Sequence, residues 1–324
     1  MADQNTPPPW TSALNAEQYA TFITTLQTLF SDQGLDATID VGRGVLAFTD
    51  PQSDSEGEFD LAGLADAAGA APDAAAMRAL LTERLDEVFM NFGDNTEALA
   101  LNDDWEKARG RILPRLHPLE LVEDNAETVT YRDVGGGLAA VLVYDLPSSL
   151  YSIEPDVTAT WPVNAEELWA TALDNLRNEA PSPDVEEVML DEVQVVVVYG
   201  DSFVITSRML ILEDVLDPEE FPYGALVAAP HRHLMAFVPI LNADQATAAI
   251  EQLILLAREE HADGPGPLSA DLFWWLSGDI ERIVVEVDEA NRELLIDPPE
   301  TLVDLLDALA EADEDDDLSY FDEE

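Results

Sequence analysis

Negative charge is the feature that most constrains this chain. Its 324 residues include 68 Asp and Glu against 14 Lys and Arg, which gives a formal net charge of −54. Nucleic acid is bound through Lys and Arg that displace its counterions, and anionic membranes attract basic segments, so neither partner is expected. Because 47% of the residues are hydrophobic, we expect a folded protein with a packed core rather than a disordered polyelectrolyte.

The carboxylates are dispersed rather than gathered in one segment. Nine lie in the last 14 residues, and the other 59 are spread over the first 310. Their mutual repulsion acts over a Debye length of about 10 Å at 0.1 M salt but only about 3 Å at 1 M. The basic residues comprise 13 Arg and a single Lys, Lys107, and Arg makes the better bidentate pairs with carboxylates. We interpret this as adaptation to the salt-rich cytoplasm of a halophile; an acidic protein that mimics nucleic acid or binds basic partners is the alternative.

Several protein classes are excluded by what the sequence lacks. Without Cys there is no disulfide scaffold, thiol nucleophile or Cys-ligated metal site. Residues 1–10 have neither a positive n-region nor an apolar run, so no export signal is expected. The longest uncharged apolar stretches, 135–144 and 193–200, are far shorter than the roughly 20 residues of a membrane helix. We therefore expect a soluble, cytoplasmic protein.

The hydrophobic pattern predicts an α+β fold with largely antiparallel sheets and flanking helices. Helical spacing of apolar residues covers 15–29, 74–92, 203–216, 244–260 and 301–309, and a further helix follows Asn164, with Glu167 completing a capping box. Strand patterns cover 37–41 and 45–49, 59–64, 128–133 and 138–144, 185–190 and 193–199, 225–229 and 234–240, and 282–287 and 292–296. We expect the strand over 193–199 to be buried on both faces.

These elements predict two α/β-type units and an acidic C-terminal tail. We expect a flexible N-terminus over 1–14, an N-terminal α+β unit over 15–118, a central α+β domain over 119–262, a C-terminal strand pair and helix over 263–310, and a disordered acidic tail over 311–324. The N-terminal unit opens with the order α-β-β-(β)-α.

Two histidines near a predicted turn are a weak candidate for a metal site. His231 and His233 alternate at a strand end, so both rings can point to the same side. With a carboxylate they would suit zinc or iron. Because Arg232 lies between them and no third His is near, we interpret them as turn residues and predict no metal and no cofactor. Whether they ever bind a metal stays open.

Asp201 and Ser202 follow a predicted buried strand, as the nucleophile of an α/β-hydrolase does. That motif needs Gly two residues after the Ser, and Val204 stands there. We interpret Ser202 as the N-cap of the next helix, with Asp201 near its positive end, and expect Arg208 to pair with Asp201 or to bind an anion. The alternative is a hydrolase or anion-binding enzyme that uses Asp201, Ser202, Arg208 and His231.

One cluster of basic residues occurs at 107–117. Its Lys107, Arg109, Arg111 and Arg115 form a candidate anion patch, with His117 nearby. We favour the other interpretation, in which these cations make ion pairs that anchor the joint between domains, because such pairs are the ordinary use of Arg.

Five short segments share a pattern with a known family: ILPR at 112–115, ALDNL at 172–176, DSF at 201–203, TSRML at 206–210 and VAAPHRHL at 227–234. In order and spacing they resemble the YtpQ-like family, bacterial proteins of unknown function. The resemblance extends from about residue 16 to 260, with a YtpQ-like core within 119–262. The resemblance implies a soluble intracellular protein without assigned catalytic residues. The candidate binding surface comprises Asn175, Asp201, Ser202, Ser207, Arg208, Pro230 and His231.

The sequence contains no convergent nucleophile, base or cofactor motif. We therefore predict a non-enzymatic binding or adaptor protein with an unknown protein or small-molecule partner. The hydrolase is one alternative. A secretion-chaperone-like dimer, suggested by the α-β-β-(β)-α opening, is another, and a homodimer stays open.

If the excess of carboxylates is an adaptation to high salt, the stability of the chain should depend strongly on ionic strength. We expect the thermal unfolding midpoint to rise by several degrees between 0.1 M and 2 M KCl, because repulsion between exposed charges is screened. Circular dichroism during heating measures this midpoint. An unchanged midpoint, with a compact protein in low salt, would contradict the interpretation.

Overall fold

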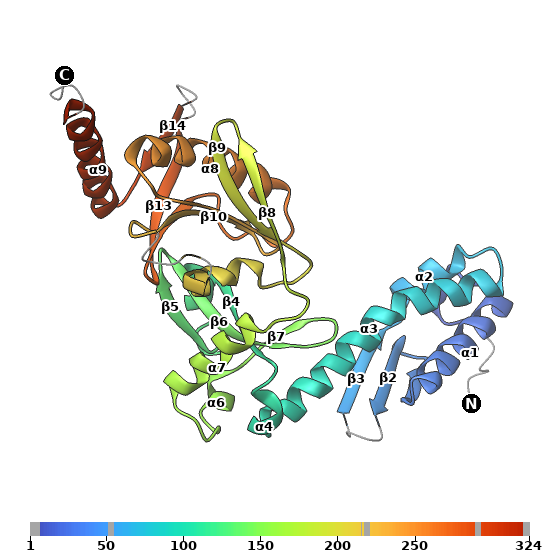
Figure 1. Cartoon of the computed structure of the whole chain (residues 1–324). Coiled ribbons are helices and arrows are strands. Elements are labelled where there is room, and N and C mark those ends of the chain that lie inside the picture. Colours follow the sequence, from blue (N-terminus) through green and yellow to red (C-terminus); the bar gives the residue numbers. More distant parts are fainter. Residues whose placement is uncertain (1–6, 51–54, 215, 217–220, 289–292, 320–324) are drawn as a thin grey trace. The chain divides into compact units, whose positions relative to one another are not determined.

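The computed structural model describes residues 7–50, 55–214, 216, 221–288 and 293–319, which divide into two compact units (Figure 1). Unit 1 lies within residues 1–103 and 146–151, and unit 2 within 104–145 and 152–324. The predicted α+β class with largely antiparallel sheets is confirmed. The boundary falls after residue 103 rather than after 118, because residues 112–118 form a strand of unit 2.

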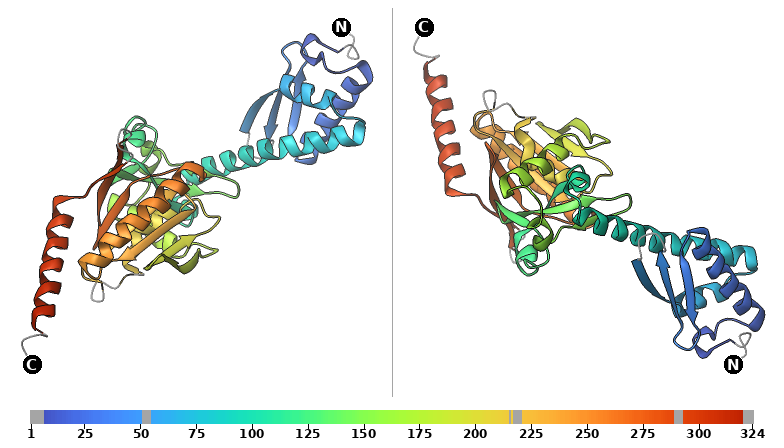
Figure 2. Two further views of the ribbon diagram at one scale, coloured as in Figure 1. Left: turned by 90° about the horizontal axis from the view of Figure 1, so that it is seen from above. Right: turned by 90° about the horizontal axis from the view of Figure 1, so that it is seen from below.

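Unit 1 is an antiparallel sheet with helices against one face (Figures 1 and 2). Its elements are the 3-10 helix η1 (Pro9–Thr11), α1 (Ala16–Asp32), β1 (Asp36–Asp40), β2 (Val45–Asp50), β3 (Ser55–Asp60), α2 (Ala62–Gly69) and α3 (Ala74–Asn102). This order agrees with the predicted opening. The strand predicted over 59–64 is wrong beyond Asp60, since α2 begins at Ala62.

The core of unit 1 lies between its sheet and its helices. Leu46 and Phe48 of β2 are buried against Phe22, Leu26 and Leu81 of the helices. Alternate strand residues point the other way, as the period of a strand requires. The resulting open face is largely acidic and comprises Asp36, Thr38, Asp40, Ala47, Glu56, Glu58 and Asp60.

Residues 7–14 pack on unit 1, although the sequence predicted a flexible segment over 1–14. The indole of Trp10 donates a hydrogen bond of 2.8 Å to the carbonyl of Val41, and Thr11 and Leu14 are buried. The apolar area of Trp10 and Leu14 explains the difference, since it is removed from water only by this packing. Residues 1–6 lie outside the described residues.

The segment 146–151 belongs to unit 1 through one buried carboxylate. Asp94 of α3 is 4% exposed and accepts hydrogen bonds from the hydroxyls of Ser148, at 2.6 Å, and Ser149, at 2.7 Å. The backbone N–H of Ser148 donates a third at 3.2 Å. A short strand, β7 (Leu150–Ser152), falls where the two units divide.

Unit 2 contains two antiparallel sheets in the part of the chain that the structure describes. The small sheet has the order β4 (Ile112–Pro118), β6 (Leu138–Asp145), β5 (Tyr131–Gly135). The large sheet has the order β14 (Glu293–Asp297), β13 (Asp279–Asp288), β12 (Leu272–Leu276), β10 (Ala225–His231), β11 (Leu234–Pro239), β9 (Val193–Tyr199), β8 (Asp184–Leu190). The helices are α4 (Trp105–Ala108), α5 (Leu119–Glu123), α6 (Pro155–Thr158), α7 (Ala165–Arg177), the 3-10 helix η2 (Ile205–Asp214), α8 (Ala243–Asp263) and α9 (Glu300–Ser319).

The large sheet is covered on both faces at its centre. Helix α8 crosses one face, where Leu226 and Ala228 of β10 pack against Leu253 and other residues of the helix (Figure 2, left). The β5–β6 turn approaches β12 and β13. All seven residues of β10 are buried, whereas Gln194 of β9 is exposed. The prediction that 193–199 is buried on both faces is therefore wrong.

Other helices and strands also differ from the sequence pattern. Strands β4 and β12 were not predicted, and β12 and β13 join the large sheet, so 263–310 is no separate segment. The helix predicted over 203–216 is the 3-10 helix η2, interrupted at Ile211, as its β-branched residues favour. Helix α9 continues to Ser319, where the sequence predicted a disordered tail from 311. Residues 320–324 lie outside the described part.

No described helix is both long and apolar enough to cross a membrane.

Gly224 gives a test of the close packing at the centre of the large sheet. Its φ is +72°, and a Cβ there would collide with the carbonyl oxygen of Trp275. Gly278 has a φ of +94° with open space around it, so it is a matched control. We expect Gly278→Ala to lower the free energy of unfolding by about 1 kcal/mol through backbone strain. We expect Gly224→Ala to cost about 2 kcal/mol more, because the β12 backbone must shift. Urea titration measures both, and equal losses would contradict the described packing.

Candidate functional site

A cavity of about 540 Å³ in unit 2 brings several predicted residues together. Asp201, Ser202 and His231 all line it, with His233 and Glu260 beside them. Strands β9 and β11 pair so that their ends meet here, with Tyr199 opposite Leu234. We call this cavity the His231 pocket. Arg208, the fourth residue of the predicted enzyme site, instead lines a separate and mostly apolar cavity of about 170 Å³.

His231 is buried and bonded at both ring nitrogens. It is 6% exposed, and its Nδ1 accepts a hydrogen bond of 3.3 Å from the backbone N–H of His233. Its Nε2 therefore carries the proton and faces a carboxylate oxygen of Glu260 at 3.4 Å. Burial lowers the pKa of His231, and Glu260 offsets this only in part. The ring is thus a neutral donor to Glu260.

His233 has no ring nitrogen left for a metal. Its Nδ1 donates to the carbonyl of Gly200 at 3.0 Å, and its Nε2 accepts from Nε of Arg232 at 3.0 Å. In the described part of the chain, no group of three His, Asp or Glu side chains is placed to hold a metal ion. The contacts of His231 and His233 agree with the interpretation of both as structural turn residues.

Glu179, which the sequence analysis missed, connects two of the predicted residues. One carboxylate oxygen accepts a hydrogen bond from the hydroxyl of Ser202, and the other lies 3.1 Å from Nη2 of Arg208. The side chains of Glu179 and Arg208 are 11% and 15% exposed, so the pair is largely withdrawn from water. Arg208 therefore pairs with Glu179 and not with Asp201 as predicted. The hydroxyl of Ser202 also accepts from the backbone N–H of Val204, in a turn that leads into a 3-10 helix rather than an α-helix.

The remaining residues of the candidate binding surface have structural contacts. Ser207 is fully buried, and its hydroxyl accepts the backbone N–H of Leu116 at 3.1 Å, on edge strand β4. Asn175 donates from Nδ2 to the carbonyls of Arg109, at 2.7 Å, and Ile112, at 2.8 Å. Pro230 is buried in β10, and its carbonyl accepts the N–H of Leu268. These three residues do not share one exposed surface.

The basic cluster does not form the predicted anion patch. Lys107 lies 3.0 Å from Asp104, and Arg109 lies 3.5 Å from Glu106, each pair on the same turn of chain. Arg111 donates to the carbonyl of Asp145 at 3.2 Å. Of the four cations, only Arg115 lies within the strand β4. Lys107 and Arg109 make ion pairs, as the favoured interpretation expects, but both pairs are local to residues 104–109 and neither joins two domains.

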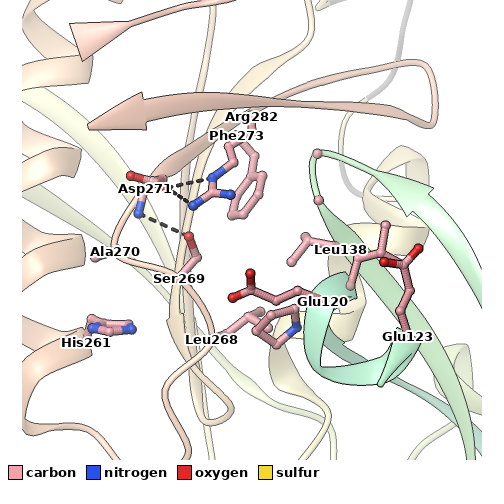
Figure 3. Close-up of a pocket in the computed structure, with 14 residues that line it drawn as sticks. Glu120, Glu123, Leu138, His261, Leu268, Ser269, Ala270, Asp271, Phe273 and Arg282 are labelled. Carbon is pink, nitrogen blue, oxygen red and sulfur yellow. Dashed lines mark hydrogen bonds and ion pairs between the residues drawn. The ribbon is translucent and has the colours of Figure 1, made fainter. Parts of the chain in front are cut away.

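A second cavity, of about 410 Å³, lies between α5, the end of α8 and the strands β12 and β13 (Figure 3). Asp271 is buried beside it and accepts hydrogen bonds from Nε of Arg282, at 2.6 Å, and from the backbone N–H of Val285, at 2.8 Å. Figure 3 shows Glu120 extending from α5 toward Ser269. No motif in the sequence indicates this cavity, because its walls come from five distant segments. Asp271 and Arg282 line this cavity, and because they are bonded to each other we interpret them as a structural pair.

Comparisons of the chain with protein-family models, with curated proteins and with solved structures found no match. The resemblance to the YtpQ-like family stays a prediction.

His117 on β4 should make the free energy of unfolding depend on pH. Burial, assisted by the positive charge of Arg115, lowers the pKa of His117 from 6.5 to about 4. In the unfolded chain His117 binds a proton near pH 6.5, but in the folded chain only near pH 4. Its contribution to stability is therefore fully present above pH 6.5 and is lost as the pH falls toward 4.

We expect the wild type to lose about 1–2 kcal/mol more unfolding free energy than His117→Gln between pH 7 and pH 5. Urea titrations of both proteins at both pH values, in 2 M KCl, measure the difference. The carboxylates are common to both proteins, so their titration cancels. Equal losses would show that His117 titrates alike in the folded and unfolded chains.

Proposed function

We propose that the chain is a non-enzymatic binding protein that acts in the cytoplasm of a halophile and takes its ligand in the His231 pocket. The observation that carries the proposal is the bonding of its polar side chains. Ser202 is held by Glu179, and His231 lies between the N–H of His233 and Glu260. The Ser–His pair of a serine hydrolase is missing among the described residues: the hydroxyl of Ser202 donates to Glu179, which is itself paired with Arg208, and no hydrogen bond joins Ser202 to a His. These fixed polar groups suit recognition of a ligand.

The charge around the pocket favours a cationic group as ligand. Asp184, Asp201 and Glu260 line the pocket, and its lining includes neither Lys nor Arg. The carboxylates come from three separate segments and form no three-residue metal cluster within the described ranges. An amine or guanidinium, on a small molecule or on a side chain of a partner protein, is therefore the ligand class we propose.

The hydrolase stays as the second candidate because Asp201, Ser202 and His231 line one cavity. Against it, Arg208 lies elsewhere and is paired with Glu179.

The secretion-chaperone-like dimer has less support. The open face of the unit 1 sheet is acidic rather than apolar. Met90 and Leu99 are exposed on α3, but nine residues apart they lie on opposite sides of the helix.

Calorimetric titration in 2 M KCl with arginine amide, ethanolamine and spermidine tests the binding proposal. We expect at least one of these cations to bind the wild type, and Asp201→Asn to weaken that binding by about tenfold because a charge-assisted hydrogen bond is lost. Glu154→Gln, which removes an exposed carboxylate outside the pocket lining, is the matched control and should bind as the wild type does. The proposal fails if no cation binds, or if both variants bind equally.

Hydrolysis of chromogenic carboxylic and phosphoric esters separates the enzyme from the binding protein. We expect the wild type and Ser202→Ala to show the same background rate. A rate that depends on Ser202 and on His231 would overturn the non-enzymatic proposal.

A further inference from the structure

The last strand of the large sheet has an outer edge that no described strand covers (Figure 1). Strand β8 pairs with β9 on one side, and the order of the sheet ends there. An edge strand presents unpaired N–H and C=O groups, which makes it a template for one more strand. Two apolar side chains of β8, Val185 and Met189, are 58% and 61% exposed. These observations mark β8 as an interaction surface.

Two cavities lie beside this edge. The His231 pocket includes Asp184 and Tyr199, which pair across β8 and β9. The mostly apolar cavity of about 170 Å³ includes Val185 and Val198, the next pair along the two strands. Because successive residues of a strand point to opposite faces, the two cavities lie on opposite faces of the sheet, one residue apart along β8. We call the apolar one the Val185 cavity.

The walls of the Val185 cavity suit an apolar side chain. Those that come from three neighbouring strands and from η2 include Val185, Val198, Met235, Phe237, Ile211 and Leu212. Two arginines also line the cavity, but Arg177 is paired with Asp214 and Arg208 with Glu179. Since these charges are already compensated, the cavity offers a visiting side chain mainly apolar contact.

The carboxylates of the edge follow the same alternation. Asp184 and Glu186 lie on the face of the His231 pocket, where Glu186 accepts a hydrogen bond of 2.6 Å from the hydroxyl of Tyr199. Strands β8 and β9 contain neither Lys nor Arg. A strand laid along β8 would therefore place one residue beside Asp184, the next beside the Val185 cavity and the third beside Glu186. A cation matches the first and third positions, and Arg is the cation whose fork fits a carboxylate.

We propose that β8 binds an extended segment of a partner protein in which a large apolar residue stands between two arginines. Main-chain hydrogen bonds join the segment to β8, the apolar side chain enters the Val185 cavity, and the arginines face Asp184 and Glu186. The pattern is the same in both chain directions, so it suits a parallel or an antiparallel strand. The inference rests on the proposed function, because the arginine beside Asp184 supplies the cationic group expected in the His231 pocket.

The partner is a different protein rather than a second copy of this chain. Cations two residues apart occur in the sequence only at 107, 109 and 111, and the residues between them are Ala108 and Gly110. Such small residues would leave the Val185 cavity unfilled. Pairing of two β8 edges with each other would also bring like charges together, which is unfavourable.

High salt favours contact of this kind over contact through charge alone. At 1 M salt exposed charges are screened within about 3 Å, so only closely opposed pairs still attract. Main-chain hydrogen bonds and apolar burial carry no net charge, and screening does not weaken them. A paired strand therefore supplies the affinity in the saline cytoplasm proposed here, and the two arginines select the partner.

Calorimetric titration in 2 M KCl with acetyl-Thr-Ser-Arg-Leu-Arg-Ser-Thr-amide tests the proposal. We expect one site per chain and an affinity at least about tenfold above that of acetyl-Arg-Ser-Thr-Leu-Thr-Ser-Arg-amide. The second peptide has the same composition, but its arginines lie away from Asp184 and Glu186. Equal binding of the two peptides, or no binding of the first, would overturn the proposal.

Two exposed positions on the two edges of the large sheet give a matched pair of variants. We expect Val185→Lys to weaken binding of the first peptide by about tenfold or more, because it places a cation beside the apolar cavity and the arginines. Leu294→Lys makes the same kind of change on the other edge strand, β14, where Leu294 is 41% exposed. It should leave the affinity unchanged. Equal affinities of the two variants would contradict binding at β8.

Methylation of the peptide amides separates strand pairing from binding by side chains alone. The amides of a strand point alternately to its two edges, and only one edge can pair with β8. We compare one peptide N-methylated at both arginines with another N-methylated at the leucine and the following serine. One of them should lose binding and the other should keep it. Equal effects of the two modifications would overturn the pairing.

The amine probes of the proposed function distinguish the two failures. If arginine amide binds the wild type and is weakened by Asp201→Asn, but the two peptides bind alike, the strand proposal fails and the cationic ligand stands. If neither the amines nor the peptides bind, both proposals fail.

Discussion

The scarcity of positive charge is the constraint on which much of this structure depends. Because carboxylates outnumber cations by nearly five to one, ion pairs cannot neutralise the surface, and the arginines that are paired act at particular joints. Arg177 contacts Asp174 on its own helix and both Glu213 and Asp214 at the end of η2. These carboxylates raise the pKa of Arg177, which keeps it charged. Exposed pairs of this kind contribute little singly, so their use lies in fixing which segments meet, while the apolar cores supply most of the stability.

The sequence predicted those elements whose boundaries are set by local chemistry. Asn164 and Glu167 form the expected capping box at the start of α7, with both reciprocal hydrogen bonds present. The glycines at 42 and 44 mark the turn between β1 and β2 as expected. Strand β12 has no such signal, because a strand buried on both faces shows no alternation of polar and apolar residues. Strand β4 was not predicted because its Arg, His and Pro residues are typical of a surface segment. In the structure it pairs with β6 and bonds to Ser207 of η2.

The candidate site was predictable only in part, for a related reason. Asp201, Ser202 and His231 come together because β9 and β11 are neighbours, and hairpin patterns had predicted both strands. The carboxylates that bond to the predicted residues lie far away in the sequence. Glu179 is 29 residues from Arg208, and Glu260 is 29 residues from His231. In a chain with an acidic residue at about every fifth position, spacing does not show which carboxylate reaches a given base. The pairing of Arg208 with Glu179 rather than Asp201 follows from the three-dimensional path alone.

The same excess of carboxylates gives a reason why the polar contacts around the His231 pocket and on β4 are buried or neutral. Salt at molar concentration screens exposed charges within a few ångströms, but it acts much less on buried groups. His231 and His117 both have lowered pKa values and are neutral imidazoles near pH 7. His233 is bonded to a backbone carbonyl, and the Glu179–Arg208 pair is largely buried. A site built in this way keeps its geometry in the saline setting proposed here, where one built from exposed ion pairs would loosen.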